Sequence, residues 1–483
     1  MENCVLPVQR ITPDDDYHYF FGYYDKCPWN SDERFVLAQR SSFMDHDPGA
    51  DDVLQIGVID TADKCRFSPI AATRAWNWQQ GCMLRWLPGR ENDTLVFNDR
   101  RDGRFVTVIH SLTTGAEDVI GFASYDIAPN GRDVVTGNFE RVHASRPGYG
   151  YAELADPFGD ELAPEKDGIY LGNLATGDKR LIFSLADALH VGKVLPGPEA
   201  KTWFNHFTYS PAGTRFVVLH RWASGGPKAG HTGFFSRMLS MDCLGNDVAI
   251  PIEDAKISHF SFFDDARLAV WLEAPQRGIY GYYLVDIITG DMHKIGEDNF
   301  LSDGHCNYSP DRRWLLTDRY PVENATQPLF LYELASGRCR QIGAFTSITD
   351  MNTSSRCDLH TRWNRHSSKV CFDSTHEGRR AIYQIDVTPI TSGKLSANAA
   401  EKQADGRRIS PNITLFCFSF ILGWIVKLIV LKYGNSQLYS RMKPLMIGII
   451  AGEILGAMTP SLIGVIYYFI TGNIPKPYVL YMG

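Results

Sequence analysis

A histidine occupies the same position in four successive copies of a sequence repeat, three residues before an aromatic residue that opens a turn. The four are His206, His259, His305 and His360. Histidine makes up only 14 of the 483 residues, so this agreement is far above chance. Neutral imidazoles that converge on one point favour a transition-metal ion. The alternative is a structural habit of the repeat, but the earlier copies do without histidine and have Lys26, Met83 and Ser124.

Two carboxylates lie close to these histidines in sequence. Asp303 stands two residues before His305, and Asp358 stands two before His360. Alternate residues of a strand share one face, so each acid faces the same way as its histidine. Either carboxylate could bind a metal or orient an imidazole from behind.

Guanidinium groups recur at or just after the second strand of several repeats, where we expect them to surround the histidines. The six are Arg40, Arg100, Arg101, Arg141, Arg221 and Arg319. A single arginine is more often a solvated charge, but such a ring suits the recognition of carboxylates. Aromatic and amide side chains precede the second turn, namely Trp76, Trp78, Gln79 and Gln80. From these sets we take as candidate substrate-binding residues Arg101, Arg319, Trp78 and Gln80.

The repeat itself predicts the fold that must position these residues. A turn related to aromatic-Ser-Pro-Asp-Gly-Arg is followed by apolar strand residues and begins at positions 29, 86, 127, 209, 262, 308 and 363. The average spacing is (363 − 29)/6, or about 56 residues. Gly-containing hairpin turns follow in most copies. Four short strands repeated seven times predict an all-β fold, a seven-bladed β-propeller over residues 1–390. We expect residues 5–11 to supply the last blade's fourth strand, and the long connection 138–167 to form a wall or lid.

Composition bears on the cellular compartment of the protein and on the class of its partners. The net charge is −7 and no strongly basic block occurs, which argues against nucleic acid as a partner. The ten cysteines are scattered without paired spacing, as in a protein from a reducing compartment. The first 16 residues lack a secretory signal pattern, so we expect a cytoplasmic propeller.

The last eighty residues differ from the rest of the chain. Residues 391–411 are polar and read as a linker, and 412–472 contain two apolar runs, 413–431 and 445–470. Each run is long enough to cross a bilayer, so we predict two transmembrane helices with both ends in the cytoplasm. Lys427 and Glu453 are costly within a membrane, and a buried helical hairpin is the alternative.

Over residues 15–388 the sequence resembles the oligogalacturonate lyases, intracellular seven-bladed propellers that use a manganese ion. The motifs that carry the resemblance are residues 206–211, 304–311 and 358–363. TolB-type propellers share the turn, so the histidines carry the comparison. The resemblance implies β-elimination on an acidic, uronic-acid-containing oligosaccharide. His305 and His360 match metal ligands, His259 falls at the position of the catalytic base, and Arg221 at that of a carboxylate-binding arginine.

The sequence departs from that family in its last blade. Asp358 and Arg356 stand where the family has further histidine and glutamine ligands. A carboxylate would still bind Mn²⁺ well. The predicted metal ligands are therefore His206, His305, His360 and Asp358.

Two other functions stay open at this point. The first is a non-catalytic propeller of the TolB or WD40 type that acts as a membrane-tethered binding scaffold. The second is a hydrolase with paired carboxylates, which ranks last because no acid pair is better placed than the histidines.

Overall fold

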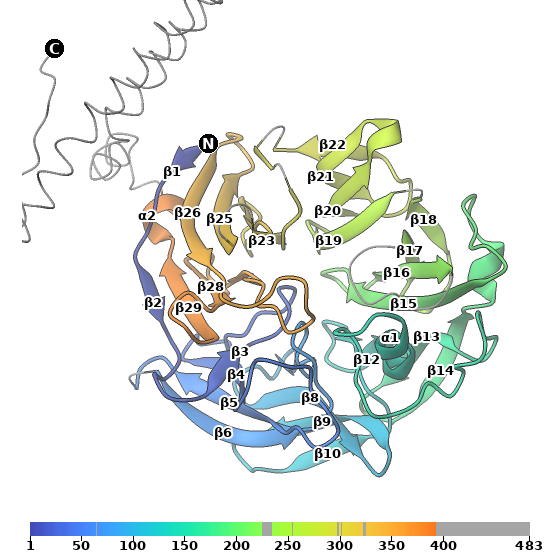
Figure 1. Cartoon of the computed structure of the whole chain (residues 1–483), viewed down its shortest axis with the longest axis horizontal. Coiled ribbons are helices and arrows are strands. Elements are labelled where there is room, and N and C mark those ends of the chain that lie inside the picture. Colours follow the sequence, from blue (N-terminus) through green and yellow to red (C-terminus); the bar gives the residue numbers. More distant parts are fainter. Residues whose placement is uncertain are drawn as a thin grey trace, which may run out of the picture. The chain divides into compact units, whose positions relative to one another are not determined.

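Seven small sheets, antiparallel except for one added parallel strand, are arranged around a central axis in the computed structural model of this chain (Figure 1). The structure describes residues 1–392 apart from 64, 225–233, 254, 297–298, 301 and 322–324. The predicted linker and transmembrane helices therefore lie outside the described residues. The predicted seven-bladed propeller is confirmed.

Six sheets have four strands and one has five. The strands of blades one to three are β3 (His18–Phe20), β4 (Phe35–Ser41), β5 (Leu54–Asp60), β6 (Arg66–Thr73), β7 (Arg85–Trp86), β8 (Thr94–Arg101), β9 (Arg104–Ser111), β10 (Glu117–Ile120), β11 (Asp126–Ile127), β12 (Asp133–Thr136), β13 (Gly168–Asn173) and β14 (Lys179–Ser184). Those of blades four and five are β15 (Ala200–Tyr209), β16 (Arg215–Ser224), β17 (Phe235–Asp242), β18 (Ala249–Ile252), β19 (Lys256–Phe262), β20 (Arg267–Ala274), β21 (Ile279–Asp286) and β22 (Met292–Ile295). Blades six and seven contain β23 (Asn307–Tyr308), β24 (Trp314–Asp318), β25 (Thr326–Glu333), β26 (Cys339–Thr346), β27 (Arg362–Trp363), β28 (Lys369–Ser374) and β29 (Ala381–Asp386).

The N-terminus closes the ring. Strand β2 (Val8–Arg10) pairs antiparallel with β29 and completes blade seven, as the sequence predicts for residues 5–11. Strand β1 (Glu2–Asn3) pairs parallel with β26 and adds an outer strand to blade six, which the sequence did not indicate. The first eleven residues therefore contribute strands to both blade six and blade seven.

The repeated turns determine which residues face the channel. In six blades the aromatic or apolar residue that opens each turn ends the innermost strand, and in blade one Trp29 forms an isolated bridge to Val36. Apolar side chains between neighbouring sheets form the core; one cluster joins Val217 and Leu219 of blade four to Phe260 and Val270 of blade five. Residues just before each turn are thus held at one level of the channel.

Helices are few among the described residues. They are α1 (Phe139–Ser145), α2 (Thr388–Thr391) and the 3₁₀ turns Asp187–His190 and Pro275–Arg277. None of the helices in this part of the chain has the length and apolar character needed to span a bilayer. Helix α1 lies in the connection 138–167, between β12 and β13.

Candidate metal centre

Irregular backbone turns the histidines of the repeat toward the channel. The register of β15 shifts between Asn205 and Thr208, and that of β19 shifts between Ile257 and Phe260. His206 (φ 58°) and His360 (φ 43°) have left-handed backbone, as does Met83 (φ 56°) at the equivalent position of blade two. Bulges and positive φ re-aim a side chain at a cost in backbone energy, and both are typical of functional sites.

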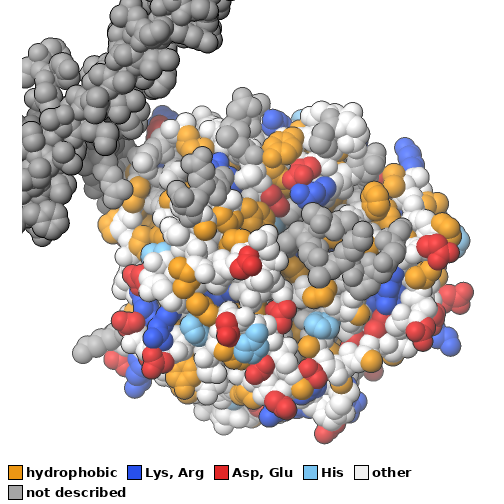
Figure 2. Space-filling model, viewed as in Figure 1, with side chains coloured by type: hydrophobic (Ala, Val, Ile, Leu, Met, Phe, Trp, Pro, Cys, Tyr) orange, Lys and Arg blue, Asp and Glu red, His pale blue; other side chains and the backbone are white. Residues whose placement is uncertain are grey.

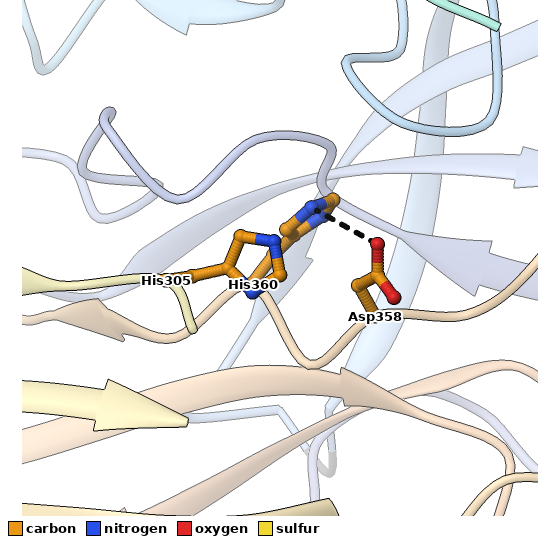
Figure 3. Close-up of side chains that lie close together, drawn as sticks. All are labelled: His305, Asp358 and His360. Carbon is orange, nitrogen blue, oxygen red and sulfur yellow. Dashed lines mark ion pairs between the residues drawn. The ribbon is translucent and has the colours of Figure 1, made fainter. Parts of the chain in front are cut away.

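Three ligand atoms converge at the inner ends of blades six and seven (Figure 3). His305, Asp358 and His360 each offer an atom within 4.8 Å of the other two, and all three side chains are buried. His305 Nε2, His360 Nε2 and Asp358 Oδ1 have no hydrogen-bond partner. Buried polar atoms are rarely left unpaired, so three together indicate a ligand. Two imidazoles and a carboxylate suit Mn²⁺ and neighbouring divalent metals.

Asp318, at the end of β24, orients the first of these ligands. Its carboxylate accepts hydrogen bonds from the main-chain N–H of His305 at 2.6 Å and from Nδ1 at 2.9 Å. The proton on Nδ1 leaves the Nε2 lone pair for the ion. Burial opposes a charged imidazole, but the carboxylates of Asp318, Asp358 and Asp303 together outweigh it and raise the pKa of His305. Sequence analysis missed Asp318. Its position at the end of a second strand, next to Arg319, is the feature that could have indicated it.

His259 lies against this triad but faces a different acid. Its ring centroid is 4.1 Å from that of His305. Nδ1 lies 3.1 Å from both Asp303 Oδ1 and Ser258 Oγ. Burial and the neighbouring His305 lower the pKa of His259, so its ring is neutral near pH 7. Asp303 therefore orients an imidazole of the preceding blade, one of the two roles expected for it.

His206, which we predicted as a metal ligand, lies outside the triad. The ring of Tyr23 stacks on it, with centroids 5.4 Å apart and planes at 15°. Tyr23 comes from the excursion between β3 and Trp29, and its ring is also 5.1 Å from that of His360. Burial and the positive charge of Arg221 hold the pKa of His206 well below its ordinary value. Sequence analysis noted in this blade only that Lys26 stands where later blades have histidine, and it missed Tyr23.

Arg221 supplies a buried positive charge near the histidines. It is 3% exposed, and its Nε and Nη1 atoms have no hydrogen-bond partner. Burial and the nearby Arg146 lower the pKa of Arg221 to about 9. Both guanidinium groups stack on Phe234, at 4.8 Å and 4.7 Å from its centroid. An anion placed here would relieve the cost of burying the charge.

The predicted substrate-binding residues are placed differently from one another. Gln80 reaches the histidines indirectly, since it donates to the Tyr125 hydroxyl at 2.7 Å and that hydroxyl binds the backbone N–H of His206. Trp78 is buried in the core of blades one and two. Arg101 pairs with Asp99 and Glu117, both at 2.9 Å, and Arg319 lies over Phe330.

These contacts decide which residues enter the site. The pairing of Arg101 satisfies its charge locally, and the core position of Trp78 leaves no face for a sugar. The face shown in Figure 2 intersperses acidic and basic side chains. We therefore leave Arg101 and Trp78 out of the site, and substrate binding by Arg319, whose Nε makes no hydrogen bond, stays a prediction.

The fold and this geometry define a β-propeller with a histidine-carboxylate centre in its channel. An oligogalacturonate lyase from Vibrio parahaemolyticus aligns with 79% of this chain and 94% of its own, at 13% identity and a TM-score of 0.55. Another structure, oligogalacturonate lyase in complex with manganese, covers 79% and 93% at 15% identity and a TM-score of 0.54. TolB from Acinetobacter baumannii covers 73% and 80% at 11% identity and a TM-score of 0.35. At such identities the likeness shows the propeller fold alone.

Sequence comparisons add one match. Residues 408–474 fit a family of unknown function (DUF6785), and this segment lies outside the described residues. A search of curated proteins gives no match.

Proposed function

We propose that the protein is a metal-dependent lyase that cleaves uronic-acid-containing oligosaccharides by β-elimination. The observation that carries this proposal is the convergence of three buried atoms that make no hydrogen bond, His305 Nε2, His360 Nε2 and Asp358 Oδ1. The similarity to oligogalacturonate lyases in fold supports it.

His259 has the properties of the base that this reaction needs. Its Nδ1 proton is directed to Asp303, which leaves the Nε2 lone pair to accept a proton. Its lowered pKa keeps the imidazole neutral. Asp303 then stabilises the imidazolium that forms when the C5 proton of the uronate is removed.

The metal triad and Arg221 make that C5 proton acidic. A divalent ion held by His305, His360 and Asp358 would draw negative charge from the C6 carboxylate. Arg221, which has unpaired N–H groups, would bind the same carboxylate. Charge that develops at C5 can then spread into the carboxylate, and the C4 oxygen leaves to give a 4,5-unsaturated sugar.

Metal analysis of the purified full chain tests the site directly. One bound divalent ion is expected per chain, and His305→Ala and His360→Ala should each remove it. His206→Ala is the matched control and should keep the ion, because His206 lies outside the triad. Loss of metal in none of these variants, or in all of them, contradicts the site.

Incubation with oligogalacturonate and Mn²⁺, with EDTA as the negative control, tests the reaction. An ultraviolet-absorbing unsaturated product indicates elimination. New reducing ends without that absorbance indicate hydrolysis instead. Metal binding without cleavage of any uronate would favour the binding-scaffold alternative.

A further inference from the structure

Tyr149 is a buried tyrosine beside the histidines that contacts two guanidinium groups. Arg356 Nη2 donates to the Tyr149 hydroxyl at 3.2 Å, and the Arg146 guanidinium lies 4.5 Å from the centre of its ring. The ring itself meets that of His206 edge-on, with centroids 5.5 Å apart. Tyr149 therefore lies within the same cluster as the proposed site, on the wall supplied by blade three.

The connection 138–167 holds Tyr149 rigidly. The glycines on either side permit close packing: a Cβ on Gly148 would lie 2.7 Å from Ser354 Cβ, and one on Gly150 would lie 2.2 Å from the Phe139 carbonyl oxygen. The Gly150 carbonyl accepts a hydrogen bond from Asn77 Nδ2 at 3.1 Å. A side chain fixed in this way is already in position before substrate binds, which favours catalysis.

The charges around Tyr149 also distinguish it from its neighbours. Burial raises the pKa of four nearby tyrosines, namely Tyr23, Tyr24, Tyr125 and Tyr320. Burial acts on Tyr149 in the same direction and Asp358 adds to it, but Arg356 and Arg146 outweigh both and lower its pKa. Its phenolate is therefore the easiest of the five to form.

We propose that Tyr149 is the general acid that protonates the departing C4 oxygen. The inference rests on the proposed lyase function. His259 Nε2 takes the C5 proton, and the electron pair of that C–H bond becomes the C4–C5 double bond. The C4–O4 bond breaks, and O4 takes the proton of the Tyr149 hydroxyl. Arg356 and Arg146 stabilise the resulting phenolate, and water returns a proton from His259 to Tyr149 after product leaves.

The dependence on the leaving group tests this role. Full-length wild type and Tyr149→Phe are compared on oligogalacturonate, whose leaving group is a sugar oxygen, and on a galacturonate that carries fluoride at C4. Fluoride leaves without a proton. We expect Tyr149→Phe to slow the oligosaccharide reaction by about 10²–10⁴-fold and the fluoride reaction by less than about tenfold.

Tyr125→Phe is the matched control, because it removes the hydroxyl of another buried tyrosine that contacts His206. It should change both reactions by the same factor. Arg146→Gln is a second variant that keeps the test open if Tyr149→Phe fails to fold. By raising the pKa of Tyr149 it should slow the oligosaccharide reaction selectively.

The outcomes separate this inference from the proposed function. If wild type cleaves both substrates and the Tyr149→Phe loss is equal on both, or if Arg146→Gln shows no selectivity, Tyr149 is not the acid. If wild type cleaves neither substrate, the lyase function fails and the role of Tyr149 fails with it. Melting temperature and metal content equal to wild type in Tyr149→Phe exclude a merely structural effect.

Discussion

Replacing Asp318 by asparagine should weaken metal binding without removing a ligand. The carboxylate accepts two hydrogen bonds from His305, at 2.6 Å from the main-chain N–H and at 2.9 Å from Nδ1. An amide of the same shape offers one neutral oxygen and an NH₂ group. Its oxygen can accept in place of Oδ1, but it is neutral, so it increases the basicity of Nε2 less, and the NH₂ group in place of Oδ2 cannot accept from Nδ1.

The expected loss of Mn²⁺ affinity follows from the effect that such carboxylates have in other metal sites. Loss of a carboxylate behind a metal-binding imidazole weakens affinity about 10–100-fold, which is about 1.4–2.7 kcal/mol. Calorimetric titration of EDTA-stripped full chain with Mn²⁺ measures it. The titration is made at pH 8, because the raised pKa of His305 lets protons compete with the ion at lower pH.

Asp303→Asn is the control for this experiment. It makes the same chemical change behind the adjacent imidazole, His259, which lies outside the triad. We expect its Mn²⁺ affinity to stay within about threefold of wild type, by contrast with the loss of a ligand-orienting carboxylate. Unchanged affinity in Asp318→Asn, or equal weakening in both variants, would refute the assignment of His305 as a ligand oriented by Asp318.

Three further predictions concern stability. Arg221→Met should raise the free energy of unfolding by about 1–3 kcal/mol in urea titrations, because it removes a buried charge with unpaired N–H groups. The same variant should abolish uronate cleavage, and a lower free energy of unfolding would contradict the prediction. The metal-free chain should lose stability as pH falls from about 6.5 to 5, because burial lowers the pKa of seven described histidines, whereas the unfolded state takes up protons there; the raised pKa of His305 opposes this trend. The seven are His18, His143, His206, His220, His259, His360 and His376. A flat urea-unfolding profile over that range would count against it. Deleting residues 1–11 should lower the free energy of unfolding by about 3–6 kcal/mol, from the lost burial of Leu6 and Ile11 alone. An unchanged melting temperature would argue against closure of the ring by β2.

The repeat could be predicted from the sequence because its signals are local. A turn of a few residues followed by an apolar strand fixes each blade, and the same register places His259, His305 and His360 at one level of the channel. The fold and the positions of these three imidazoles follow from that periodicity. Gln80 illustrates its limit: the residue was found, but its contact with Tyr125 was not foreseen.

The rest of the site depends on contacts between distant parts of the chain. Tyr23 excludes His206 from the triad because an excursion of blade one inserts a ring between them. Asp303 serves His259 of the preceding blade, so spacing alone could not choose its partner. The pairing of Arg101 with Asp99 and Glu117 is local, but it too could not be predicted, because it depends on a hairpin register that composition does not reveal.

The charges gathered in the channel explain why the site should select an anion. Each of the three acids already has a partner: Asp303 faces His259, Asp318 faces His305, and Asp358 accepts from Arg356 at 2.9 Å. Arg356 also donates to Tyr149, so the same guanidinium connects the metal ligand with the proposed acid.

Arg221 and Arg146 each carry one positive charge near those acids, and a divalent ion on the triad would add two positive charges. In a buried site such an excess of positive charge is costly unless a ligand brings negative charge with it. A neutral sugar would leave Arg221 buried and unpaired, whereas a uronate carboxylate would pair with it and with the ion at once. The selectivity for acidic sugars that we propose thus follows from the charge that the channel lacks.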